Sequence, residues 1–190
     1  MTDAARLRIT LADIDPAPWR EVDVPLSMTL KSLHDTIQAA FLWFNCHLWE
    51  FGIGGRRYGL SMDDDWGGDK VYDASVARLG RLRKMDGQRF LYTYDFGDNW
   101  EHEIVVISLF EMETGMRLPR LVDGQWRTPP ENVGGPSGFK SFLEAMSDTT
   151  HEDHEYMCDW YGKDFDPNDF ELEIVQIQLK RLANQRRKKR

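Results

Sequence analysis

The chain has 190 residues, of which 41% are apolar and 12% aromatic, and its formal net charge is −8. This length and composition are typical of one globular domain with a packed core. The longest apolar run, residues 39–44, is too short to span a membrane, and the polar start lacks the apolar region of a signal peptide, so we expect a cytoplasmic protein.

The charge is distributed unevenly. From Lys180 onward there are seven bases and no acid, which leaves residues 1–179 with 17 bases, 32 acids and a net charge of −15. A body this acidic repels phosphate backbones, so any nucleic-acid contact would run through the basic tail. That tail consists of Arg186, Arg187, Lys188, Lys189 and Arg190.

The two cysteines, Cys46 and Cys158, show no Cys-x-x-Cys spacing and no dense framework. They are therefore interpreted as reduced thiols or small core residues. A structural zinc site made only of thiolates is excluded.

The first sixty residues predict two hairpins and a helix. Residues 7–14 and 19–24 contain alternating apolar and polar positions, which is typical of two paired strands. Thr29 is suited to cap a helix whose apolar residues recur every three or four positions from Leu30 to Phe44. Residues 47–53 predict a third strand and residues 56–60 a short fourth, joined by a glycine turn.

The middle of the chain is the densest in informative residues. After a predicted surface loop at 61–69 and a short helix at 75–82, residues 89–94 and 100–108 predict two strands of a hairpin. Gly97 is expected to supply the positive φ of the turn. Alternation then places Trp100 and His102 on the buried face of the second strand.

The last third predicts a loop at 111–125 followed by three helices. A glycine-rich segment with Glu131, Gly134, Gly135 and Ser137 precedes the first of these helices, at a position that can hold an anion or can simply form a rigid turn. Further helices are predicted at 150–160 and 169–182, the latter with an inward stripe. We expect this stripe to comprise Phe170, Ile174, Ile177 and Leu179 or Leu182.

This order of elements predicts an α+β protein with a β-grasp-like mixed or antiparallel sheet, a helix packed across one face, and C-terminal helices. We expect one domain at 1–185, with a sheet core at 5–110, a helical extension at 136–184 and the tail at 186–190. No internal repeat is present.

Three motifs resemble the Ri-plasmid ORF-three-like family, whose members are also labelled passenger proteins of insertion elements. They are the opening pattern within residues 7–51, Tyr-Asp-Phe-Gly-Asp-x-Trp-x-His at 94–102, and Pro-Pro-Glu-Asn-x-Gly-Gly-x-x-Gly-Phe at 129–139. The resemblance implies an α+β fold and an origin in bacterial mobile elements, and it implies no settled activity. Where the family often has Cys and Asp, this chain has Thr128 and Asn132, which weakens a metal role for that loop.

The candidate functional cluster draws on the hairpin and the third strand. It comprises Asp95, Asp98, Trp100, His102, His47 and Glu50. If the strands are neighbours, His47, Glu50, Asp98 and His102 can converge as a divalent-metal site. The alternative is that the two aspartates bind turn amides and His102 is a hydrogen-bonded core residue.

The leading functional hypothesis is a non-enzymatic binding or accessory module of a plasmid or mobile element, because no catalytic set is assembled in the sequence. Seven tryptophans favour a protein partner or self-association. Two alternatives stay open: a small metal-dependent hydrolase using the His, Asp and Glu cluster, and a weak nucleic-acid binder acting through the tail. No cofactor is predicted other than such a metal, and no membrane contact is expected.

Overall fold

Eight strands form one sheet in the order β5-β4-β3-β6-β7-β1-β2-β8, and every neighbouring pair is antiparallel except β4 and β5. The computed structural model describes residues 3–60, 70–82, 89–162 and 164–188. The strands are β1 (Ala4–Leu11), β2 (Trp19–Pro25), β3 (Trp49–Ile53), β4 (Arg56–Gly59), β5 (Val71–Asp73), β6 (Arg89–Tyr94), β7 (Trp100–Phe110) and β8 (Arg120–Gln125). The helices are α1 (Leu30–Phe41), α2 (Leu79–Leu82), α3 (Gly135–Ser147), α4 (His154–Tyr161) and α5 (Leu172–Lys188).

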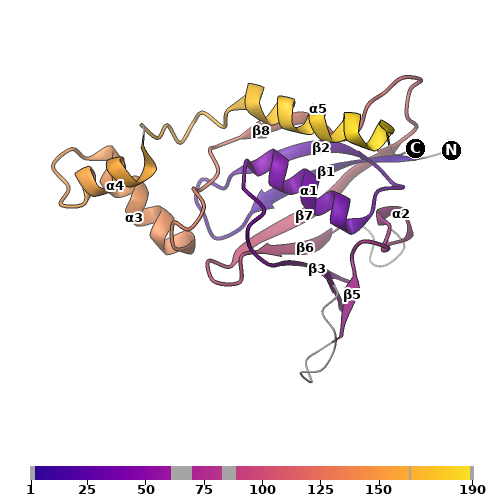
Figure 1. Cartoon of the computed structure of the whole chain (residues 1–190), viewed down its shortest axis with the longest axis horizontal. Coiled ribbons are helices and arrows are strands. Elements are labelled where there is room, and N and C mark those ends of the chain that lie inside the picture. Colours follow the sequence, from indigo (N-terminus) through magenta and orange to yellow (C-terminus); the bar gives the residue numbers. More distant parts are fainter. Residues whose placement is uncertain (1–2, 61–69, 83–88, 163, 189–190) are drawn as a thin grey trace.

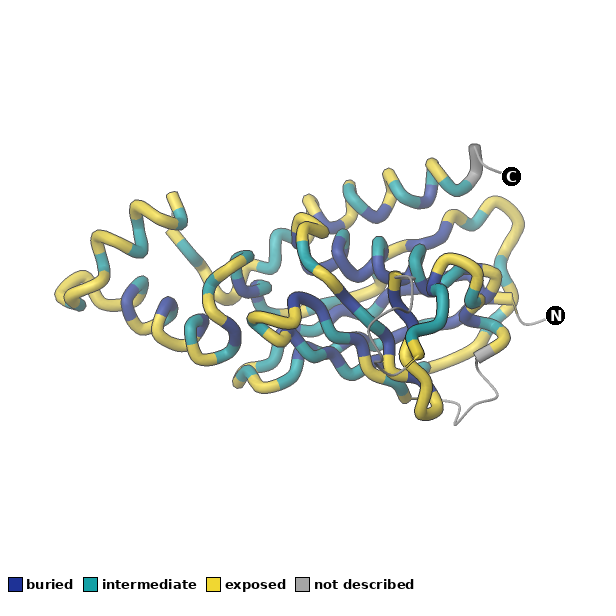
Figure 2. Tube along the Cα trace, turned by 60° about the horizontal axis from the view of Figure 1, so that its bottom comes forward, coloured by how far each residue is buried: buried dark blue, intermediate teal, exposed yellow. Residues whose placement is uncertain are grey.

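Helix α1 lies across one face of the sheet, and α5 lies beside it over β8 (Figure 1). Buried residues gather in the strands and on the inner side of α1, whereas α3 and α4 stand at one end of the molecule, where α3 has one buried side and α4 has no buried residue (Figure 2). None of the described helices has both the length and the apolar composition needed to cross a membrane.

The α+β class, the first hairpin and the central hairpin are confirmed. Thr29 caps α1, since its hydroxyl accepts a hydrogen bond from the Ser32 amide. In β7, Trp100, His102 and Ile104 are buried, as the alternation predicts. The finer assignment to a β-grasp is not confirmed by this strand order.

Three local expectations are wrong. The predicted loop at 111–125 contains β8, an edge strand that pairs with β2 and extends the sheet beyond residue 110. Being mostly exposed, β8 lacks the apolar alternation that reveals a half-buried strand. In the β6–β7 turn the positive φ angles belong to Asp95 and Asn99, and Gly97 is not among the positive-φ residues.

The third correction concerns α5. Val175, Leu179 and Ala183 form its buried stripe at a spacing of four. The inward position predicted for Leu179 is confirmed, and Phe170 and Leu182 are partly buried against the core, whereas Ile174 and Ile177 are exposed. The helix also continues through the predicted boundary at 185 as far as Lys188, so the start of the basic tail is helical. The predicted loop at 61–69 and the tail residues Lys189 and Arg190 lie outside the described residues.

A buried arginine connects the sheet to the segment that leaves β8. Arg20 of β2 donates from Nε to the Ala40 carbonyl of α1, and from Nη1 to the carbonyls of Trp19, Gln125 and Trp126. Its Nη2 reaches the Thr128 hydroxyl at 3.3 Å. Burial lowers the pKa of Arg20 to about 9, which still leaves the guanidinium charged at neutral pH.

Two aromatic rings and a glycine surround the Arg20 side chain. Its guanidinium carbon lies 5.1 Å from the ring centroid of Phe41 and 4.5 Å from that of Phe170. A Cβ on Gly124 would lie 2.8 Å from Arg20 Cδ, so glycine permits β8 to approach here. Arg20 thereby fixes the path of residues 125–128 toward the C-terminal end of α1.

Replacing Arg20 by methionine should lower the free energy of unfolding by about 3–5 kcal/mol, because several buried carbonyls would lose their donor while the apolar stem is kept. Urea unfolding measures this change. The control is Arg89→Ala, which breaks an exposed ion pair with Glu103 and should cost under about 1 kcal/mol. Equal losses in the two variants would contradict the anchoring role of Arg20.

Candidate functional site

The loop between α1 and β3 carries the first two residues of the candidate site, Cys46 and His47. It is held by a closed ring of hydrogen bonds that the side chains of α1 and β6 make with Asn45. Gln38 Nε2 donates to the Tyr92 hydroxyl at 3.1 Å, and that hydroxyl lies 2.7 Å from His34 Nδ1. His34 Nε2 lies 2.7 Å from Asn45 Oδ1, and the Asn45 amide donates to Gln38 Oε1 at 2.9 Å.

This ring can be satisfied completely by neutral groups. With the proton of His34 on Nε2, that nitrogen donates to Asn45 and Nδ1 accepts from Tyr92. Burial lowers the pKa of His34 to about 3 and raises that of Tyr92 well above its ordinary value, so both groups stay uncharged at neutral pH. The ring fixes the loop that carries Cys46 and His47.

The segment that follows Arg127 delivers the next side chain, Glu131. Its Oε1 accepts hydrogen bonds from the Phe44 amide at 2.7 Å and from the Tyr94 hydroxyl at 2.9 Å. The Tyr94 hydroxyl accepts in turn from the Cys46 amide at 3.1 Å. Burial raises the pKa of Tyr94, and its hydrogen bond to Glu131 acts in the same direction, so Tyr94 keeps its proton and remains a donor.

Aromatic packing on the buried side of Tyr94 supports the position of Glu131. Trp43 stacks on Tyr94 with ring centroids 5.0 Å apart, and its Nε1 donates to the Pro129 carbonyl at 3.0 Å. The second contact holds the segment before Glu131 against the residues that follow α1. The carboxylate of Glu131 is positioned by one backbone donor and one side-chain donor, which come from two parts of the chain.

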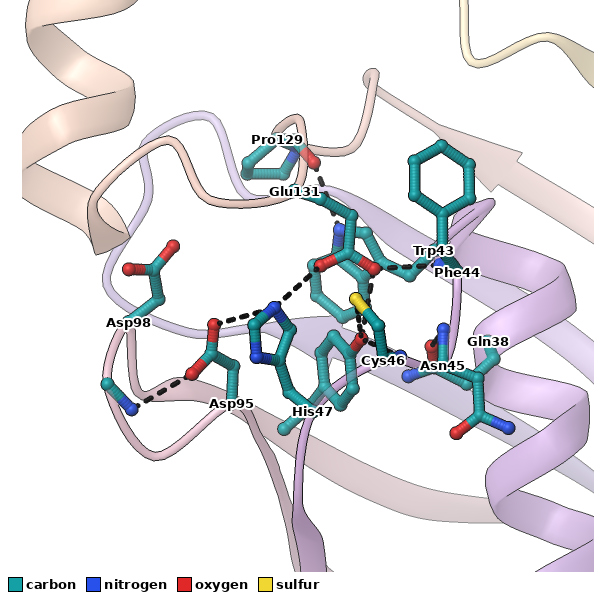
Figure 3. A network of polar contacts seen from close by, with 12 residues as sticks. Gln38, Trp43, Phe44, Asn45, Cys46, His47, Asp95, Asp98, Pro129 and Glu131 are labelled. Carbon is teal, nitrogen blue, oxygen red and sulfur yellow. Dashed lines mark hydrogen bonds and ion pairs between the residues drawn. The ribbon is translucent and has the colours of Figure 1, made fainter.

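His47 lies between two carboxylates (Figure 3). Its Nε2 is 3.4 Å from Asp95 Oδ2 and 3.7 Å from Glu131 Oε2. The other oxygen of Asp95 accepts a hydrogen bond from the Gly97 amide at 2.9 Å, as predicted for an aspartate in a turn. One ligand atom each from Cys46, His47 and Glu131 lies within 4.8 Å of the other two.

Asp98 takes a different role, at the joint between the β6–β7 turn and α3. Its Oδ2 accepts from the Gly134 amide at 3.2 Å, so the predicted anion loop receives a carboxylate of the chain itself. Gly135 has a φ of +69°, and a Cβ there would lie 2.7 Å from the Asp98 carbonyl oxygen. Ser137 is exposed on the first turn of α3.

The structure does not bring His47, Glu50, Asp98 and His102 together. Glu50 alternates with the buried Trp49 and Phe51, so it points to the opposite face of β3, where it pairs with Arg57. β3 pairs with β6 and not with β7, which separates it from His102. Asp98 lies apart from His47, beyond Asp95 (Figure 3).

His102 and Trp100 are core residues. The His102 ring is fully buried, with Nδ1 3.0 Å from the Trp100 carbonyl, and its edge meets the rings of Phe41 and Trp43. Burial lowers the pKa of His102 to about 3. This position matches the alternative interpretation of His102 as a hydrogen-bonded core residue.

Sequence reasoning placed His47 and Asp95 in one candidate group and Glu131 in another, and it left out Cys46 and Tyr94. Cys46 had no partner at a recognisable spacing. Tyr94 is the first residue of the central motif, but its position in a strand does not indicate that its hydroxyl binds the Glu131 carboxylate. Contacts between segments far apart in the chain join these residues.

A cleft of about 1170 Å³ adjoins the cluster of Cys46, His47, Asp95 and Glu131. Glu131 lines this cleft, together with Phe44 and Asn45 of the loop that carries Cys46. Its walls are the end of α1, residues 127–132, the end of α4 and the outer side of α5. An ion pair between Arg127 Nη2 and Glu171 Oε2, at 2.8 Å, joins two of these walls.

The joint at Gly135 predicts a selective effect of substitution. Gly135→Ala should destabilise the fold by about 2–4 kcal/mol, because backbone strain is combined with a collision against the β6–β7 turn. The matched control is Gly115→Ala, which has a φ of +87° and nothing within 4 Å of the added Cβ. It should cost only the strain, about 1–2 kcal/mol. Urea unfolding of both variants tests this, and equal costs would contradict a tight joint.

The buried histidines predict acid sensitivity. His34 and His102 have folded pKa values of about 3 against 6.5 for the free side chain, so the unfolded state binds more protons between these limits. Stability is therefore full above pH 6.5 and falls as the pH drops, by about 1.4 kcal/mol per pH unit for each histidine. Unfolding free energies measured from pH 7.5 to 4.5 test this. In the His34→Gln variant the dependence of the unfolding free energy on pH should be smaller by about 1.4 kcal/mol per pH unit. An unchanged dependence would contradict the low pKa of His34.

Comparisons with known proteins cover nearly the whole chain. A family model described as plasmid pRiA4b ORF-3-like protein matches residues 3–174. The chain is 37% identical over 167 residues to "Uncharacterized protein y4hQ" of Sinorhizobium fredii (strain NBRC 101917 / NGR234), which covers 87% of this chain and 85% of that protein. The crystal structure of the protein of unknown function MM3350 from Methanosarcina mazei Go1 matches with a TM-score of 0.82 and 30% identity, over 91% of this chain and 97% of that one. The resemblance seen in the sequence motifs is thus confirmed, and the chain belongs to the plasmid pRiA4b ORF-3-like family.

Proposed function

We propose that this protein is a cytoplasmic, non-enzymatic binding module, an accessory protein of a plasmid or mobile element, whose cleft takes an apolar segment of a basic partner protein. The observation that carries the proposal is the cleft of about 1170 Å³ with exposed aromatic side chains on its walls. A cleft of this size exceeds the range of about 300–1,000 Å³ that is usual for small-molecule sites.

The apolar side chains on the cleft walls support a protein segment as the occupant. Phe44 is 79% exposed, and Trp160 and Ile174 are 42% and 44% exposed. Because the Phe44 amide is bound by the Glu131 carboxylate, the backbone that carries this ring is held in place. An exposed aromatic side chain on a backbone that is held in place suits an anchor position in a protein interface.

The charge of the molecule supports a basic partner. The net charge is −8 for the chain and −15 for residues 1–179. Within the cleft Arg127 is paired with Glu171, and the other charged residues on its walls are Asp35, Glu131 and Arg181. Asp35 also pairs with Lys31, so the support for a basic partner comes chiefly from the net charge of the molecule. A basic segment that carries an apolar anchor complements both the long-range field and the local surface.

Selection from a random-peptide display library on the immobilised full-length chain tests the proposal. We expect peptides with an apolar residue flanked by lysine or arginine, and an isothermal titration should give their Kd. Phe44→Ala and Trp160→Ala should each weaken binding by about tenfold or more, since interface anchors cost about 2 kcal/mol or more when truncated.

The matched control is Val76→Ala, which truncates a 70% exposed apolar residue outside the cleft and should leave the Kd unchanged. Raising the salt concentration should weaken binding if the partner is basic. Failure to select any peptide, or peptides that bind the Phe44 and Trp160 variants as tightly as the parent chain, would sink the proposal.

A further inference from the structure

We propose that Cys46, His47 and Glu131 form a binding site for one zinc ion, which joins two segments that are distant in sequence. These residues come from the α1–β3 loop and the segment before α3, and Asp95 of the β6–β7 turn lies beside His47 as a neighbouring carboxylate. The proposal does not depend on the cleft being occupied.

The distances between Cys46, His47 and Glu131 suit one ion. Two nitrogen or oxygen ligands of a tetrahedral zinc lie about 3.3–3.6 Å apart, given metal–ligand bonds of about 2.0–2.2 Å. His47 Nε2 lies 3.4 Å from Asp95 Oδ2 and 3.7 Å from Glu131 Oε2. The Cys46 thiol completes the set, since its ligand atom lies within 4.8 Å of those of His47 and Glu131.

Two of these atoms are buried without a hydrogen-bond partner. They are His47 Nε2 and Glu131 Oε2, and they face each other. The Glu131 side chain is only 6% exposed. A buried carboxylate oxygen without a donor is costly, and a shared cation satisfies both atoms at once.

The remaining atoms of both carboxylates are held in place. Glu131 Oε1 accepts from the Phe44 amide and the Tyr94 hydroxyl, and Asp95 Oδ1 accepts from the Gly97 amide. Each carboxylate thus has one oxygen bound to the protein and the other directed toward His47. This is the outer support that orients metal ligands in known sites.

The ligand types select the metal. A thiol, an imidazole and a carboxylate suit zinc, whereas calcium and magnesium prefer oxygen ligands alone. Three protein ligands leave the fourth tetrahedral position to a water molecule. The ion would stabilise the two segments that carry the ligands, because it connects them.

Metal titration of the full-length chain tests the site. After removal of metals with EDTA, Co²⁺ should give the visible bands of a tetrahedral ion and a thiolate-to-cobalt charge-transfer band, and Zn²⁺ should displace it. Zinc at a hundredfold excess over its Kd should raise the Tm by about 5–10 °C.

Two ligand variants and two controls make the test decisive. Cys46→Ser should abolish the charge-transfer band, and His47→Ala should weaken zinc binding by more than the roughly 10–100-fold that loss of an outer partner costs. Cys158→Ser and Glu50→Gln, which lie outside the cluster, should bind zinc as the parent chain does. Circular dichroism checks that each variant is folded. A parent chain that binds no zinc, or that binds it no better than a folded His47→Ala variant, would overturn the proposal.

Discussion

The guanidinium of Arg20 is the interaction on which the rest of the structure depends. It joins β2, the last turn of α1 and the segment that leaves β8, through donors that all find oxygen atoms. A buried arginine is tolerated here because carbonyl oxygens and two aromatic rings replace its water shell. After residues 125–128, which Arg20 holds at the end of α1, the chain passes beside the α1–β3 loop. There Trp43 binds the Pro129 carbonyl, and the Tyr94 hydroxyl binds Glu131.

A polar network within the core consists of neutral groups. His34, Tyr92, Gln38 and Asn45 form a closed ring of hydrogen bonds, so the loop after α1 is held without burying a charge there. The charged groups Asp95 and Glu131 lie one layer outward, where backbone amides and the Tyr94 hydroxyl support them. The fold thus separates this neutral buried network from the charged groups Asp95 and Glu131 at the rim.

The sequence predicted those elements whose pattern is set by burial. Trp100, His102 and Ile104 alternate because one face of β7 packs under α1, and Thr29 caps α1 through a local bond. β8 was not predicted because an exposed edge strand contains few apolar residues and so shows no alternating pattern. Its partner β2 also lies about a hundred positions away in the sequence. The site was predicted in fragments for the same reason: His47, Asp95 and Glu131 meet only through tertiary contacts, and no spacing in the chain encodes that meeting.

Glu131 connects the two features to which we assign function. One of its oxygens binds the amide of Phe44, whose ring stands at the cleft, and the other faces His47. A cation that draws Oε2 toward His47 also limits how the carboxylate can turn, and this fixes the backbone under Phe44. Zinc binding therefore changes the free energy of partner binding only to the extent that it restricts the Glu131 carboxylate. The coupling is reciprocal, so partner binding changes the free energy of zinc binding by the same amount. The cleft and the charged cluster therefore share the Glu131 carboxylate.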